Sequence, residues 1–279
     1  MVQLIKRAQG SRYPSSSSTT IAGVRIDALS FGAVVDAIIA RATSRAKPSY
    51  VIPTNAQCVL LFQDDALLRD IYRRAFLVVP DGVPLIWAAS LFGSPLRGRV
   101  NGTDLLEALC AKAAGCNLRV FFVGGREGAA EAAATLLEER YAGLRICGTC
   151  CPPSGFEKNV AETERVLDAI RVARPDLLFV GLGAPKQEYW MHVHTERLSV
   201  PISVAVGGSF DILAGVVARA PLWMQHAGLE WLHRLGAEPR RLWRRYVFGN
   251  ARFCLLIGGQ VLAQCWQRAL RTKNGDHSC

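Results

Sequence analysis

The chain of 279 residues lacks the features of a secreted protein. Its first twenty residues include the run SSSSTT but no continuous apolar stretch of the kind found in a signal peptide. Nine cysteines are an odd number, so without a secretory signal we expect reduced thiols rather than a disulfide framework. We therefore expect a cytoplasmic protein with a flexible tail at residues 1–20.

Metal-binding patterns are also missing. No Asp lies two positions from another Asp, so the chain has no Asp-x-Asp metal clamp. Cys147, Cys150 and Cys151 lie close together, but no second cysteine or histidine pair follows at the spacing of zinc ligands. His192 and His194 are two residues apart on an expected helix and so cannot share a metal. The sequence predicts no metal site.

No apolar run is long enough to cross a bilayer. The uncharged run from Phe253 to Trp266 has 14 residues. As a helix it would span about 21 Å, against a hydrocarbon core about 30 Å thick. Two interpretations stay open: a buried packing helix, or an interfacial helix lying in the plane of lipid head groups.

Positive charge is concentrated near the end of the chain. The net charge is +10, and residues 219–279 carry nine Arg and one Lys against three acidic residues, which leaves +7 there. Such a patch attracts nucleic acid, an anionic membrane leaflet or an acidic substrate, and charge alone does not choose among them.

Apolar runs alternate with helical patterns, as expected for parallel strands joined by crossover helices. The sequence predicts an α/β protein with a Rossmann-like, open, mostly parallel sheet over residues 21–218. A basic helical appendage rich in Trp and Arg follows over residues 219–279. One strand near residues 21–28 is expected to start the domain, and further strands are predicted at residues 50–53, 76–80, 118–123, 144–147, 177–180 and 202–206.

Helices are predicted between these strands from the spacing of apolar residues. They fall at residues 31–45, 55–75 with a break, 83–92, 103–114, 127–141, 159–174, 186–195 and through much of 221–270.

The loops after the strands carry the candidate site, because ligands of open α/β sheets bind outside the carboxyl ends of the strands. GGREG offers Gly124 and Gly125 for close approach of backbone to a phosphate, although such turns are common. It lacks the G-x-G-x-x-G spacing, and no acidic residue follows the strand ending at Cys147 to bind a ribose hydroxyl. Both facts count against NAD.

Two polar residues sit directly after predicted strands, in PTNAQ and PDGVP. Asp81 is either a general base or the N-cap of the next helix, and the sequence leaves both open. Asn55 is likewise a cap or a ligand contact.

Lys186, Gln187 and Glu188 fall at a helix start, where the helix dipole and free N–H groups favour an anion; a solvated helix end would look similar. Near the end of the chain, Arg234, Arg241 and Arg244 would lie close to one face of a continuous helix, although Pro239 predicts a break before the last two. They are either diphosphate ligands or a basic solvated face.

Six motifs occur in an order that resembles the WecG/TagA/CpsF family of bacterial glycosyltransferases, family 26 in the sequence-based classification, over residues 21–253. The motifs are PDG with the following WAA, RVNGTDL, VFFVGG, PDLLFVGLGAPKQE, VGGSFDILAG and RAPLWMQHAGLEWLHRLGAEPRRLWRRY.

The resemblance implies a UDP-sugar-binding catalytic domain that transfers a sugar, with inversion and without a metal or cofactor, to an undecaprenyl-diphosphate-linked acceptor. It places the reaction at the cytoplasmic face of the membrane, with the appendage promoting attachment to an anionic surface. Asp81 is the implied catalytic base and Arg234, Arg241 and Arg244 the arginines needed for activity. Further implied substrate contacts are Asn55, Asn101, Asp104, Gly124, Gly125, Gly183, Pro185, Lys186, Gln187, Glu188 and Thr54, of which Thr54 is in doubt because Pro53 occupies the family's Thr position.

Two other functions remain as alternatives. A nicotinamide-dependent oxidoreductase would share the sheet but needs the acidic ribose contact that is missing. A nucleic-acid-binding protein would explain the charge but not the loops at the strand ends. We expect no nucleic-acid partner, and the sequence leaves open whether the protein is a homo-oligomer.

Overall fold

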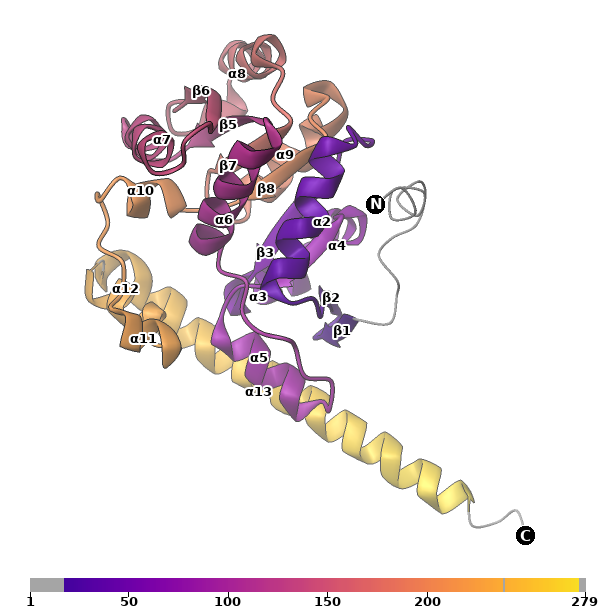
Figure 1. Ribbon diagram of the computed structural model, residues 1–279. Helices are drawn as coiled ribbons and strands as arrows, with labels where there is room; N and C mark the ends of the chain where they lie inside the picture. Colours follow the sequence, from indigo (N-terminus) through magenta and orange to yellow (C-terminus); the bar gives the residue numbers. More distant parts are fainter. Residues whose placement is uncertain (1–17, 238, 276–279) are drawn as a thin grey trace.

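Six parallel strands form the central sheet of the computed structural model, which describes residues 18–237 and 239–275 (Figure 1). Only the backbone is described for residues 226, 241, 242, 244–246 and 267–275. The strand order is β4-β3-β8-β7-β5-β6. The strands are β3 (Tyr50–Thr54), β4 (Leu77–Pro80), β5 (Arg119–Gly124), β6 (Arg145–Cys150), β7 (Leu177–Gly181) and β8 (Ile202–Ala205).

The central strands are buried on both faces, which is why they read as continuous apolar runs rather than alternating patterns. Every residue of β7 and of β8 is buried. One core packs α2 (Phe31–Thr43), α6 (Gly102–Cys116) and α7 (Ala129–Arg140) against one face of the sheet. A second core holds the other face against α3 (Ala56–Asp64), α4 (Ala66–Arg74), α5 (Val83–Leu91), α8 (Val160–Ala173) and α9 (Lys186–Leu198).

The predicted α/β fold is therefore confirmed, and each predicted helix has a counterpart. The predicted break within residues 55–75 is at Asp65, whose carboxylate caps α4 by accepting from the N–H groups of Leu67 and Leu68. Two short helices were not predicted: η1 (Phe156–Lys158) and α10 (Ser209–Leu213).

The single strand expected near residues 21–28 is wrong. Residues 18–27 form an antiparallel hairpin, β1 (Ser18–Ile21) and β2 (Val24–Asp27), that is separate from the parallel sheet. Ala22 and Gly23 turn the chain with φ values of 47° and 81°. Positive φ at both central residues is typical of the two-residue turn that matches strand twist. The Ala-Gly pair was a weak signal for it.

Strand β6 runs to Cys150, three residues beyond the predicted end at Cys147. A glycine in a strand lowers its apparent propensity, which explains the short prediction. Here Gly148 makes room for the ring of Phe121, since a Cβ at this position would lie 2.5 Å from Phe121 Cε2. Cys151 and Pro152 follow the strand, so its end still offers no acidic residue.

Three helices follow the sheet: α11 (Leu222–His226), α12 (Glu230–Ala237) and α13 (Pro239–Gly275), together called the C-terminal helices. The predicted break at Pro239 is confirmed, because α13 begins there. In Figure 1, α13 passes beneath the sheet and projects away from it toward the C-terminus. Among the described residues, no helix has the length and apolar content needed to cross a bilayer.

One face of α13 packs against the protein and the other is exposed. Phe253 and Ile257 are buried in the second core. Leu255, Leu262 and Trp266 are 78%, 72% and 70% exposed. One face of residues 253–266 therefore has the packing role, and the exposed apolar side chains of the other face leave the interfacial interpretation open.

Candidate active site

A cleft of about 510 Å³ opens at the carboxyl edge of the sheet. Its size is in the range of small-molecule sites. The loops after five strands line one side of it, and the C-terminal helices close the other. The residues that line it include Asn55, Asp81, Arg99, Asn101, Gly125, Arg126, Gly183, Gln187, Gly207, Asp211, Glu230, Trp231, His233, Arg234, Gly249 and Asn250.

Asp81 stands in this cleft directly after β4. Its backbone N–H donates to Thr54 O at 2.7 Å, which fixes the loop to the neighbouring strand. The N-cap of α5 is Gly82, with no side-chain cap. The capping role left open by the sequence is therefore excluded, and the Asp81 carboxylate is free to face the cleft.

Burial raises the pKa of Asp81 to about 6. The guanidinium groups of Arg99 and Arg234 act in the opposite direction, as does the hydrogen bond from Asn101, whereas the Glu230 carboxylate adds to the rise. A carboxylate with a pKa near neutrality, opening on a cleft, suits a general base.

Asn55 has the predicted capping role, whereas its ligand contact stays a prediction. Its Oδ1 accepts from Cys58 N at 3.2 Å and caps α3, and the residue also lines the cleft.

The glycine-rich turn after β5 differs from the prediction. Gly124 does not line the cleft, and a Cβ there would lie 2.6 Å from the carbonyl oxygen of Gly181. Gly125 does line it, but its N–H donates to Gly181 O. The N–H of Arg126 donates to Asp211 Oδ1 at 2.9 Å. The turn lets two strands approach closely, and these two N–H groups are not available to a phosphate.

The polar side chains at the start of α9 are also bonded mainly to other groups of the protein. Gln187 Oε1 accepts from the N–H groups of Gly183 at 3.2 Å and Gly207 at 3.0 Å, and so ties together two loops that line the cleft. Its Nε2 donates to the buried Glu188. Burial raises the pKa of Glu188 to about 7. Gln187 is therefore a buried residue that holds two loops of the cleft lining together.

Besides Gly124, five predicted contact residues lie outside the cleft lining. Pro185 precedes α9 as its N-cap, Lys186 pairs with Glu157 at 3.0 Å, and Glu188 is 1% exposed. Thr54 is completely buried, and its hydroxyl is directed to Ile52 O and Tyr72 rather than to the cleft. Asp104 instead forms an ion pair with Arg219.

The C-terminal helices place a cation beside Asp81. The Arg234 guanidinium reaches the turn after β8, where a Cβ on Gly208 would lie 3.5 Å from its Nη2. Arg241 and Arg244 lie on α13, and their side chains are outside the described part of the chain. Their predicted role stays a prediction.

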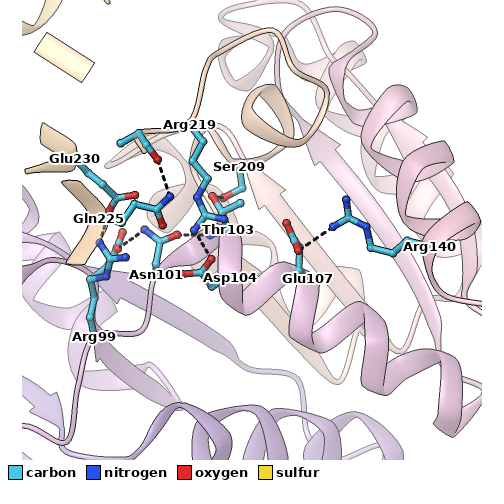
Figure 2. A network of polar contacts seen from close by, with 12 residues as sticks. Arg99, Asn101, Thr103, Asp104, Glu107, Arg140, Ser209, Arg219, Gln225 and Glu230 are labelled. Carbon is cyan, nitrogen blue, oxygen red and sulfur yellow. Dashed lines mark hydrogen bonds and ion pairs between the residues drawn. The ribbon is translucent and has the colours of Figure 1, made fainter. Parts of the chain in front are cut away.

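The sequence did not predict two residues of the cleft that lie near Asp81. Arg99 belongs to the RVNGTDL motif, and Glu230 begins α12; they form an ion pair inside the cleft (Figure 2). The motif could have indicated Arg99. The pairing joins residues 131 positions apart, which no local pattern reveals.

Comparison with known proteins decides the family. The model of the "Glycosyl transferase WecG/TagA/CpsF family" matches residues 19–269. The chain belongs to this family. It is a glycosyltransferase, so the oxidoreductase and nucleic-acid-binding alternatives fall away.

Three curated relatives are each named N-acetylglucosaminyldiphosphoundecaprenol N-acetyl-beta-D-mannosaminyltransferase. The relative from Bacillus spizizenii is 31% identical over 201 residues, which cover 72% of this chain and 76% of the relative. The relative from Bacillus subtilis is 31% identical over 64% of this chain and 67% of its own length. A Staphylococcus aureus relative is 29% identical over 70% and 74% of the two chains.

Proposed function

We propose that this glycosyltransferase moves a sugar from a UDP-sugar to an undecaprenyl-diphosphate-linked acceptor, with inversion and without a metal or other cofactor. The product would enter synthesis of a bacterial surface polysaccharide or exopolysaccharide. The observation that carries the proposal is the Asp81 carboxylate, which opens on a cleft of substrate size beside two guanidinium groups.

The reaction is a single displacement. Asp81 removes the proton from an acceptor hydroxyl as its oxygen attacks the anomeric carbon of the donor. The bond from that carbon to the diphosphate oxygen breaks, and UDP leaves from the opposite face with the bonding electrons. Asp81 is ionised above its pKa of about 6, so it is ready to accept a proton at neutral pH.

Arginines would offset the charge of the departing diphosphate. Arg99 and Arg234 line the cleft, and Arg241 and Arg244 on α13 are the further candidates. A guanidinium group binds two phosphate oxygens through two parallel N–H donors and needs no metal to do so.

The names of the relatives support the acceptor class. They describe transfer of N-acetylmannosamine to N-acetylglucosaminyl-diphospho-undecaprenol. We propose an acceptor of this kind here, with a lipid tail that keeps the reaction at a membrane.

The C-terminal helices supply a surface suited to that membrane. Leu255, Leu262 and Trp266 are exposed on α13, and Trp223 of α11 is 64% exposed. Basic residues of the same segment favour an anionic leaflet, and tryptophan favours the head-group region. We propose peripheral attachment at the cytoplasmic face.

One assay tests the proposed reaction. The protein is incubated with a panel of UDP-sugars and a polyprenyl-diphosphate-linked N-acetylglucosamine, with and without EDTA, and UDP release is followed. We expect release with one donor, unchanged by EDTA and dependent on the acceptor. No release from any donor would contradict the proposed reaction, and loss of release in EDTA would contradict metal independence.

A further inference from the structure

The cleft contains an ion pair between the body of the protein and the C-terminal helices. Arg99 Nη1 contacts Glu230 Oε2, and the two side chains are only 18% and 24% exposed (Figure 2). Both residues line the cleft, and their charges, like that of Arg234, act on the carboxylate of Asp81.

Among the described residues, two other ion pairs join the body of the protein to the segment that begins at Arg219, but neither lies in the cleft lining. Arg219 pairs with Asp104, and Arg252 pairs with Asp64 at 2.6 Å. The buried side chains of Phe253 and Ile257 also hold α13 against the second core. The carboxylate of Glu230 is different because it puts a negative charge where the proposed function requires binding of diphosphates.

A guanidinium group binds a carboxylate and a phosphate through the same pair of N–H donors. We propose that the Glu230 carboxylate takes the position on the Arg99 guanidinium that a substrate diphosphate later takes, and that binding of the diphosphate displaces this carboxylate. This inference rests on the proposed function.

The exchange keeps Arg99 paired throughout. Arg99 is paired before and after displacement, so the large cost of leaving a partly buried cation alone does not arise. Arg234 lies four residues after Glu230 on α12 and so on the same face of that helix. Arg234 lines the cleft as well, as a second cation for the same anion.

The test measures binding of two diphosphate probes by isothermal titration calorimetry: UDP for the donor, and farnesyl diphosphate for the lipid-linked acceptor. Glu230→Gln keeps the shape of the side chain and removes its charge. We expect it to lower the dissociation constant of at least one probe by about tenfold, the effect of losing a competing anion. The probe that gains identifies which diphosphate takes the Arg99 site.

Asp64→Asn is the matched control, because it also removes a carboxylate that pairs with a C-terminal helix but lies outside the cleft lining. We expect unchanged binding of both probes. Equal or weaker binding of both probes by Glu230→Gln would overturn the inference, and Glu230→Ala must change affinity in the same direction. If the wild-type protein binds neither probe, the proposed function itself fails.

Discussion

The side-chain amide of Asn101 donates a 3.1 Å hydrogen bond to Oδ1 of Asp81. The other end of that amide is fixed, because Asn101 Oδ1 accepts from Thr103 N at 2.9 Å and caps α6. With the oxygen held by the helix, the NH₂ group faces the carboxylate. One side chain therefore starts a helix and stabilises the ionised form of the proposed base.

Asn101→Ser separates these two tasks. Serine is a good N-cap, so α6 should keep its start, but the donor to Asp81 is lost. The pKa of Asp81, about 6 in the wild type, should rise, and the acid limb of the kcat/KM profile should move to higher pH. Asn101→Ala should shift the same limb and also cost about 1 kcal/mol in free energy of unfolding. An unmoved acid limb in both variants would show that the hydrogen bond does not tune Asp81.

Asp81→Asn should lower kcat by about 10²- to 10⁴-fold, the usual contribution of a general base. It should also stabilise the fold above pH 6. The pKa of Asp81 rises from 3.8 to about 6 on folding, so the native state binds the proton more tightly. Wild-type stability therefore falls as pH rises through that interval, and an amide escapes this loss.

Urea unfolding of both proteins at pH 3.5 and pH 8 checks this: the advantage of the variant should be present at pH 8 and small at pH 3.5. A variant with normal turnover would remove Asp81 from the role of base.

Gly228→Ala should weaken docking of the C-terminal helices. A Cβ at this position would lie 2.7 Å from Cγ2 of Val83, which begins α5 two residues after Asp81. The clash would push the turn between α11 and α12 away from the cleft, and kcat should fall severalfold. Gly215→Ala is the control, since its φ of +71° matches the +73° of Gly228 but open space surrounds it. If the two variants lose equal activity, backbone strain rather than the clash is responsible.

Membrane attachment should depend on the outer face of α13. Replacing Leu255 and Leu262 with serine should reduce flotation with anionic liposomes by about tenfold or more, because each leucine contributes about 1.5 kcal/mol or more when its apolar surface leaves water. Val160→Ser with Val172→Ser is the matched control. These valines are 77% and 84% exposed on α8, at the opposite end of the molecule from α13 (Figure 1). Deleting residues 219–279 should abolish flotation and most activity; unchanged binding by the truncated protein would refute the docking surface.

Much of the fold could be predicted because parallel strands are buried on both faces and leave unbroken apolar runs. Glycine limits that signal. Gly148, which makes room for the ring of Phe121, lowered the strand propensity of the last part of β6, so that part was not predicted. Gly23 forms a hairpin turn where one strand was expected. In both places the backbone conformation depends on a neighbour or a turn, not on hydrophobic pattern.

The site was predictable where a polar residue directly follows a strand, as for Asp81 and Asn55. The site was less predictable where a polar side chain forms hydrogen bonds with the protein's own backbone. Gln187 carries the pattern of an anion-binding helix start, yet its amide oxygen holds two glycine N–H groups. Sequence spacing gives the position of such a side chain but not the partner that already occupies it.

Helix α13 is one uninterrupted element of 37 residues. Gly249 on it lies beside Gln57 at the cleft, while the exposed Trp266 is 17 positions further, about 25 Å along a straight helix. Because both positions belong to one helix, the proposed membrane contact at Trp266 and the cleft contact at Gly249 lie at a fixed separation. The depth at which α13 rests against a lipid surface would therefore set the distance between the cleft and the head groups.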